Sequence, residues 1–252
     1  MWRHLFPIAL CSLASSAAAA IFDSDDRQTI DPPFPLTSVG VVTGGENIAY
    51  GSGFLVDPCT VLSARHVAGD LLDPVGRRLL FTAGRRSSHG RVISAGPYQR
   101  FADARRAVHS DWLVIRLDKC LGLTLGYLTL GRLSDSVQVE TAGYPRDRPL
   151  SKITLDKSCV VKFVRNGELY HDCATLPGDS GGPMLQEGRD GLVAIGINAA
   201  GYDWSRSVKF NASEANVAIA TADLLETLCP LLAVDSNPGC GKRALPSVLA
   251  SR

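Results

Sequence analysis

The sequence lacks an excess of one charge sign. Lysine and arginine together number 26, against 25 aspartate and glutamate residues. Nucleic acids and anionic lipid surfaces attract proteins through a clustered basic face, and this chain has no such cluster. We therefore expect neither of these partners.

A zinc-binding pattern is also missing. The seven cysteines include no Cys-x-x-Cys pair. Structural zinc sites usually need closely spaced ligands, so zinc is a weak alternative to disulfide bonds. We expect neither a metal ion nor a cofactor.

The apolar run near the N-terminus is too short to cross a bilayer. Residues 1–4 are basic, residues 5–13 apolar and residues 15–20 small. This order is typical of a signal peptide, and we expect cleavage after Ala20. An interior apolar helix is the alternative, but the abrupt change to acidic residues at Asp23 disfavours it. The mature chain would be secreted or periplasmic, monomeric and without a membrane anchor.

Cleavage would remove Cys11 and leave six cysteines, at positions 59, 120, 159, 173, 229 and 240. An even number of cysteines in an exported chain predicts disulfide bonds, because the chain meets an oxidising compartment. Sequence alone does not determine which cysteines pair.

Helix signals are nearly absent before residue 221. Short segments rich in Val, Ile and Leu, separated by Gly, Pro and Asp turns, predict strands instead. A first series comprises residues 38–43, 47–56, 60–63, 79–82, 90–95 and 112–117, and a second comprises residues 136–141, 152–164, 183–186, 192–199 and 216–220. Two such series predict an all-β fold of two packed barrels, with a cleft between them where distant residues would meet.

The remaining segments complete the predicted domain. A threonine cap and an apolar stripe predict a C-terminal helix over residues 221–228. Residues 21–35 are acidic and then proline-rich, so we expect them to run extended over the surface. The domain spans residues 21–235 with its seam near residues 130–134, and residues 236–252 form a loosely ordered tail.

Residues 178–183 read Gly-Asp-Ser-Gly-Gly-Pro. Glycines beside a hydroxyl allow a tight turn in which bare backbone N–H groups converge on one point, as an oxyanion hole requires. We expect the N–H groups of Gly178 and Ser180 to be these donors. The alternative is a glycine-rich turn capped by Asp179. The presence of a nearby base decides between these two interpretations, since a serine hydroxyl is a weak nucleophile until its proton is removed.

His66 is the candidate base, because it follows the apolar strand predicted at residues 60–63. A structural histidine is the alternative, so the assignment depends on its companions. Asp111 opens an apolar strand, where a carboxylate needs a hydrogen-bonding partner such as the His66 ring. His109 is a rival base, whereas His89 and His171 are interpreted as loop residues. The order His66, Asp111, Ser180 is that of chymotrypsin-like peptidases.

These three motifs resemble the chymotrypsin/trypsin-like serine peptidase family over residues 21–228. Val-Leu-Ser-Ala-Arg-His at 61–66, Asp-Trp-Leu-Val-Ile-Arg-Leu at 111–117 and the serine loop carry the resemblance. Asp-Asp-Arg-Gln at 25–28 and Val-Ala-Ile-Ala-Thr at 217–221 resemble bacterial secreted members such as glutamyl endopeptidases. The resemblance implies two six-stranded antiparallel barrels with the catalytic triad between them.

The sequence departs from the family pattern at two places near the triad. Val67 stands where animal members have a cysteine, and Ala199 stands where a serine usually supports the catalytic aspartate. We predict disulfides Cys59–Cys120, Cys159–Cys173 and Cys229–Cys240. The first would link the histidine and aspartate strands, the second would tie down the approach to the serine loop, and the third would close a short local loop.

The resemblance also implies which residues line the substrate pocket. Ala174 occupies the position of the acid that binds Lys or Arg in trypsin-like members, so we expect no basic preference. Thr175 matches glutamate-cleaving members, but Asn198 replaces their histidine. Gly201 would leave the entrance open and Asn216 would shorten the pocket. Small or medium uncharged P1 side chains are therefore expected.

We interpret the chain as a secreted serine endopeptidase whose partner is a polypeptide substrate. Two alternatives stay open: a catalytically silent binding protein on a peptidase fold, and an esterase-like acyl hydrolase. Another motif, Gly51-Ser52-Gly53, is weak as a phosphate loop because no helix follows it. We interpret it as relieving crowding beside the substrate.

Overall fold

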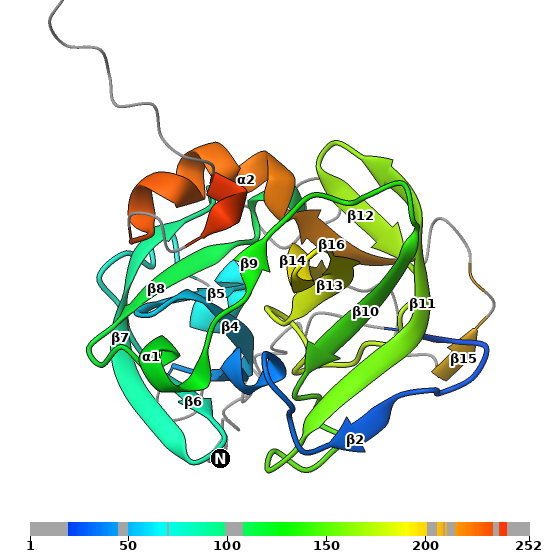
Figure 1. Cartoon of the computed structure of the whole chain (residues 1–252), viewed down its shortest axis with the longest axis horizontal. Helices are drawn as coiled ribbons and strands as arrows, with labels where there is room; N and C mark the ends of the chain where they lie inside the picture. Colours follow the sequence, from blue (N-terminus) through cyan, green and yellow to red (C-terminus); the bar gives the residue numbers. More distant parts are fainter. Residues whose placement is uncertain are drawn as a thin grey trace, which may run out of the picture.

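The computed structural model describes residues 20–44, 50–69, 71–98, 108–200, 206–208, 210, 215–233 and 237–240. Two antiparallel β-barrels lie side by side, and the C-terminal helix lies across their top (Figure 1). The fold is therefore the all-β, two-barrel architecture that the sequence predicts. No helix in the described ranges is long and apolar enough to cross a membrane.

The first barrel closes in the strand order β3-β4-β5-β8-β7-β6. Its strands are β3 (Val39–Thr43), β4 (Gly51–Asp57), β5 (Thr60–Ser63), β6 (Arg78–Ala83), β7 (Arg86–Ala95) and β8 (Leu113–Leu117). The register aligns Leu55, Val61, Ile115 and Val92 in one row across four strands. All four are fully buried apolar side chains and belong to one cluster inside the barrel.

Alternate residues of the same strands point out of the first barrel, because side chains alternate along a strand. Phe54, Leu62 and Val114 form the next row in register. They belong to a second buried cluster that also contains Leu155 and Leu185 of the second barrel. The two-residue periodicity thus builds one apolar core inside the first barrel and another between the barrels.

The second barrel follows the order β10-β13-β14-β16-β12-β11, and pairing of β10 with β11 closes it. Its strands are β10 (Gln138–Gly143), β11 (Ile153–Arg165), β12 (Glu168–His171), β13 (Pro183–Gly188), β14 (Gly191–Ala200) and β16 (Asn216–Ala220). Strand β2 (Gln28–Ile30) pairs with the edge of β11, and β9 (Thr129–Leu130) pairs with β14 in parallel.

The short helices are α1 (Gly122–Leu125), η1 (Leu36–Ser38), η2 (Arg65–Ala68), η4 (Val108–Ser110), η5 (Cys229–Leu231) and η6 (Pro238–Cys240). Helix α2 (Thr221–Leu228) has the bounds that the sequence predicts. Its buried Leu224, Leu225 and Leu228 cover the apolar cluster between the barrels. Disulfides join Cys59 to Cys120, Cys159 to Cys173 and Cys229 to Cys240, which is the predicted pairing.

The structure corrects the prediction for the two isolated histidines. His171 lies on β12, a strand that was not predicted, and it is fully buried. His89 is exposed but also lies on a strand, β7. Strand β12 was missed because its outward and inward positions both carry polar side chains, so it shows no apolar alternation.

The N-terminal segment does not run over the surface throughout. Strand β1 (Ile21–Phe22) is buried and pairs in parallel with β15 (Arg206–Val208). Arg27 is buried as well, and its guanidinium donates to the carboxylates of Asp25 and Asp147. Long-range pairing and ion pairs therefore attach this segment to the second barrel, and residues 1–19 lie outside the described residues.

The first part of the predicted tail is anchored. Asn237 is 3% exposed, and its amide donates to the carbonyls of Val56 and Leu128 while its oxygen accepts from the Leu130 N–H. These bonds hold η6 against both β4 and the strand β9 near the seam. Residues 234–236 and 241–252 lie outside the description.

Candidate active site

His66 lies on the short helix η2, directly after β5. Strand β5 pairs with β4 and β8 on both sides, so the backbone that carries His66 starts from the rigid centre of the first barrel. Gly69, with φ of 91°, ends the turn and donates its N–H to the His66 carbonyl at 2.9 Å. A positive φ favours glycine at this position. The imidazole therefore projects from a defined turn.

Asp111 holds His66 at two points. One carboxylate oxygen accepts the His66 backbone N–H at 2.9 Å, and the other lies 2.7 Å from Nδ1 of the ring. The Asp111 carbonyl also accepts the Arg65 N–H at 3.2 Å. Asp111 precedes β8 and is not its first residue, and the Asp111 side chain is 23% exposed. A carboxylate at Nδ1 places the proton there and leaves Nε2 free to act as a base.

The environment sets the basicity of the imidazole. Burial alone would lower the pKa of His66, but the charge of Asp111 and its hydrogen bond to Nδ1 outweigh burial and raise the pKa above 6.5. Both effects of Asp111 favour the protonated ring. His66 is thus suited to take up a proton and to hold it until a leaving group needs it.

The serine loop connects β12 to β13 and lies against the strand that leads to His66. Gly178 and Gly181 have φ of 109° and 85°, which L side chains rarely adopt. A Cβ on Gly181 would lie 2.3 Å from both the Ser52 carbonyl and the Ser63 hydroxyl. The glycines are therefore required both by backbone conformation and by close approach of the loop to the first barrel.

Ser180 is half-buried in this loop. Among the described residues its hydroxyl has no hydrogen-bond partner within 3.5 Å, so the Ser180–His66 bond is not closed in this structure. Such bonds are often long in enzymes without substrate. Gly51 lies between the serine loop and Val67, because a Cβ there would be 2.7 Å from the Ser180 carbonyl and 2.4 Å from the Val67 side chain. Gly51 thus makes room for the serine loop.

Asp179 is buried directly before the nucleophile. Its carboxylate accepts the Leu176 N–H at 2.9 Å. Burial raises the pKa of Asp179 to about 7, although that hydrogen bond and the charge of Arg27 act in the opposite direction. The carboxyl therefore braces the loop from inside and does not face the imidazole as a second acid.

The predicted pocket residues differ in how their polar atoms are used. Ala174 and Thr175 are 4% and 5% exposed. Asn198 is 4% exposed, and neither atom of its amide group has a partner among the described residues. The Asn216 amide is fully engaged, since it donates to the carbonyls of Ala20 and Cys173 and accepts the Ala20 N–H. Gly201 lies outside the described residues.

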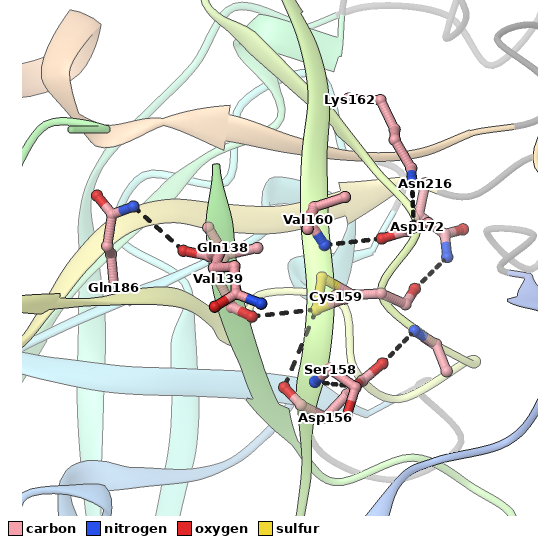
Figure 2. The surroundings of a disulfide bond; sticks show 12 residues. Gln138, Val139, Asp156, Ser158, Cys159, Val160, Lys162, Asp172, Gln186 and Asn216 are labelled. Carbon is pink, nitrogen blue, oxygen red and sulfur yellow. Dashed lines mark hydrogen bonds and ion pairs between the residues drawn. A yellow bond between two sulfur atoms is a disulfide. The ribbon is translucent and has the colours of Figure 1, made fainter. Parts of the chain in front are cut away.

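The Cys159–Cys173 disulfide lies directly before Ala174 in the chain, and Figure 2 shows its surroundings. Asp156 accepts the N–H groups of Ser158 and Ala174 beside the disulfide. Asn216 donates to the Cys173 carbonyl on the other side. Asn216 therefore fixes the backbone of the wall instead of offering its amide to a substrate.

Two residues near the candidate triad were missed by sequence reasoning. The buried guanidinium of Arg65 donates to the carbonyls of Gly96, Leu71 and Leu72, and so ties neighbouring loops to η2. Buried Glu168 accepts the His109 N–H at 3.2 Å and thereby links β12 to the turn before Asp111. Arg65 was visible as a basic residue beside His66, but Glu168 gave no local signal.

The rival base and a metal centre find no support in the described residues. The His109 side chain is 54% exposed, and its Nδ1 lies 3.8 Å from Glu168 rather than near Asp111. Within the described ranges, no group of three or more His, Cys, Asp or Glu side chains is arranged to hold a metal ion. The Ala199 position is buried and supplies no hydroxyl to Asp111.

Two solved structures with a similar fold are described as peptidases. One solved structure, described as a Glu endopeptidase, is 20% identical with a TM-score of 0.61, and the match covers 84% of this chain and 98% of that one. A serine endoprotease from Yersinia pestis is 18% identical with a TM-score of 0.55, covering 78% of this chain and 63% of that one. Among curated protein sequences, none matches this chain significantly.

A family model gives the assignment. The model described as a trypsin-like peptidase domain matches residues 51–197, which include the three candidate triad residues. This range is more than half of the chain. The chain therefore belongs to the trypsin-like peptidase domain family.

Proposed function

We propose that this protein is an exported serine endopeptidase that cleaves peptide bonds through an acyl-enzyme on Ser180. The observation that carries the proposal is the two-point contact between His66 and Asp111, together with a serine loop whose Gly181 packs against the end of the strand that leads to His66. Two bonds to one carboxylate fix both the backbone and the ring, as proton transfer requires.

The reaction proceeds by nucleophilic acyl transfer. His66 Nε2 takes the proton of the Ser180 hydroxyl as its oxygen attacks the carbonyl carbon of the scissile peptide. The carbonyl oxygen becomes an oxyanion and accepts hydrogen bonds from the N–H groups of Gly178 and Ser180. Asp111 stabilises the imidazolium, which then donates its proton to the leaving amine. Water repeats the cycle on the ester, releasing the acid and restoring the serine.

The pocket that we propose accepts small or medium uncharged P1 side chains. Ala174 supplies no carboxylate, so a buried Lys or Arg would stay unpaired at a cost of several kcal/mol. Asn198 brings an amide without a formal charge, which disfavours strong selection for glutamate. A library of peptides that differ at P1 tests this. Dominance of Arg or Lys, or of Glu by more than about tenfold over Ala, Val and Gln, would contradict the pocket assignment.

The function itself is tested with a fluorophosphonate probe and with casein. The probe acylates an activated serine, so the purified exported protein should be labelled, and Ser180→Ala should not. Casein should be cleaved by the same preparation. Absence of labelling would favour a silent binding protein, and labelling with ester hydrolysis but no casein cleavage would favour an acyl hydrolase of the esterase type.

A further inference from the structure

Ser52 lies at the start of β4, between the two glycines of the Gly51-Ser52-Gly53 motif. It is fully buried, and strand alternation places it on the same face as Phe54, which packs between the barrels. Neither the acyl transfer nor the pocket described above uses this residue. Its hydrogen bonds nevertheless connect it to the nucleophile loop of the other barrel.

Ser52 makes hydrogen bonds through both its side chain and its backbone. Its hydroxyl donates to the Gly178 carbonyl at 2.8 Å and accepts the Tyr144 N–H at 2.9 Å. Its backbone N–H donates to the Ser180 carbonyl at 2.7 Å. Its carbonyl accepts the Ser63 hydroxyl at 2.7 Å. All donors and acceptors of this residue are therefore engaged.

Two of these bonds act on the residues that carry the candidate oxyanion donors. Ser52 holds the carbonyls of both Gly178 and Ser180, whose N–H groups would face the substrate oxygen. A carbonyl shares its peptide plane with the next residue's N–H, so these bonds fix the planes that follow Gly178 and Ser180, each joined to the donor N–H through one Cα. Glycine at position 178 has the most rotational freedom to lose there. The bond from the Ser52 hydroxyl therefore limits how the backbone at Gly178 can turn.

The glycines around Ser52 allow the nucleophile loop to contact β4 directly. A Cβ on Gly143 would lie 3.1 Å from the Ser52 hydroxyl and 2.4 Å from a carboxylate oxygen of Asp179. A Cβ on Gly51 would lie 2.7 Å from the Ser180 carbonyl. Side chains at either position would separate the loop from β4. The local sequence thus allows direct contact between the first barrel and the nucleophile loop.

We propose that Ser52 is a positioning residue that aligns the oxyanion donors of Gly178 and Ser180 with the imidazole of His66. Through the Ser63 hydroxyl it joins the strand that leads to His66 to the loop that carries the nucleophile. This role rests on the proposed function, because it concerns the same acyl transfer. Ser52 itself contacts no reacting atom.

The test compares Ser52→Ala with Ser88→Ala. Ser88 is a matched control on β7, because its buried hydroxyl also donates to a carbonyl, that of His89 at 2.8 Å, and accepts a backbone N–H, that of Lys119 at 2.9 Å. Both variants lose the same two kinds of hydrogen bond. Only Ser52→Ala releases the nucleophile loop.

Kinetics on a peptide substrate separate alignment from folding. Removing an oxyanion donor lowers kcat by about 10²- to 10³-fold, so losing its support should cost about 10- to 30-fold in Ser52→Ala. KM should change less than about twofold, since ground-state binding is not involved. A peptidyl boronic acid with alanine at P1, which imitates the tetrahedral intermediate, should bind more weakly by the same factor as kcat. Ser88→Ala should keep the kcat and boronate affinity of the wild type.

The outcomes distinguish this role from the proposed function. A Ser52→Ala variant with wild-type kcat and boronate affinity would overturn the positioning role of Ser52. The proposed function would still stand in that case if the fluorophosphonate labels the wild type. A wild type that no fluorophosphonate labels would overturn both. If Ser52→Ala is insoluble, Ser52→Cys keeps the side-chain shape with a weaker donor and should give an intermediate kcat. An unchanged kcat in that variant would also refute the role.

Discussion

The interiors of the two barrels are built from different kinds of side chain. Inside the first barrel, residues such as Leu55, Phe81 and Ile115 are apolar and fully buried. Inside the second barrel, the buried cluster contains smaller residues and the Cys159–Cys173 disulfide. The strand register places His171 and Asn198 on the same face of the sheet as the buried Ala218. Neither polar side chain has a hydrogen-bond partner among the described residues.

This difference shows how the two barrels divide the work of the site. The His66–Asp111 pair needs fixed geometry, and it projects from the edge of a barrel with a close-packed apolar core. The predicted pocket needs polar groups whose hydrogen bonds are left for a substrate. The second barrel contains such groups, at a cost in the free energy of unfolding. Under the proposed function, the first barrel therefore holds the base and its carboxylate, and the second barrel carries the nucleophile loop and the polar groups of the predicted pocket.

The largest effect should come from removing one member of the pair or the nucleophile. We expect Ser180→Ala and His66→Ala each to lower kcat by about 10⁴- to 10⁶-fold, because the three residues act as one unit. Circular dichroism should show an unchanged fold. A variant that kept a tenth of wild-type turnover would contradict the assignment of the triad. It would also contradict the different roles that we give to the two barrels.

Asp111→Asn should lower kcat by about 10⁴-fold. An asparagine amide at this position would donate to Nδ1 and shift the ring proton to Nε2, so the imidazole would present the wrong tautomer to Ser180. Steady-state kinetics on a peptide substrate measure the loss. A decrease of less than about tenfold would mean that the two-point contact serves only to hold the turn.

The pH profile should depend on the first barrel. Only the neutral imidazole accepts the Ser180 proton, and Asp111 raises the pKa of His66 above 6.5. We expect kcat/KM to fall by about tenfold for each pH unit below that raised pKa. The midpoint should therefore lie above 6.5, and a profile that stays flat down to pH 5 would contradict the assignment of the base.

Core substitutions should have opposite effects on the two barrels. Ile115→Ala should lower the free energy of unfolding by about 2 to 5 kcal/mol, because it removes buried contacts and leaves a cavity. His171→Leu should be neutral or stabilising, because it replaces an unpaired polar ring by an apolar side chain. Urea unfolding measures both, and His89→Leu on the exposed face of β7 is a control for loss of a histidine. A loss of several kcal/mol in His171→Leu would show that the ring is a structural partner.

For each pH unit, the smallest expected loss is a change in the pH dependence of stability. Burial lowers the pKa of His171 from 6.5 to about 3. Between these values the unfolded chain binds a proton that the folded chain does not, so stability falls as the pH decreases, by about 1.4 kcal/mol for each pH unit from this residue. The difference in unfolding free energy between His171→Leu and the wild type should thus grow as the pH decreases from 6.5. A constant difference would show that the ring is not buried as a neutral base.

The sequence by itself determined the features that depend on short stretches of chain. Strand β5 and helix α2 have their predicted bounds, because the apolar pattern acts within a few residues. The predicted threonine cap is wrong, since Ala220 is the N-cap and the Thr221 hydroxyl donates to the carbonyls of Gly131 and Ala194. The His66 and Asp111 motifs were recognisable for the same reason. Their direct pairing was expected only because three separate motifs appeared in one order.

Only the tertiary structure decided the features that depend on contacts between distant segments. The buried edge strand β1, the polar strand β12 and the attachment of Ala20 to Asn216 arise from pairing partners far away in sequence. The role of Ser52 is another example, since its partners lie 126 and 92 residues away. A buried hydroxyl is stable only where a donor and an acceptor meet it, and that meeting exists only once the two barrels have packed together.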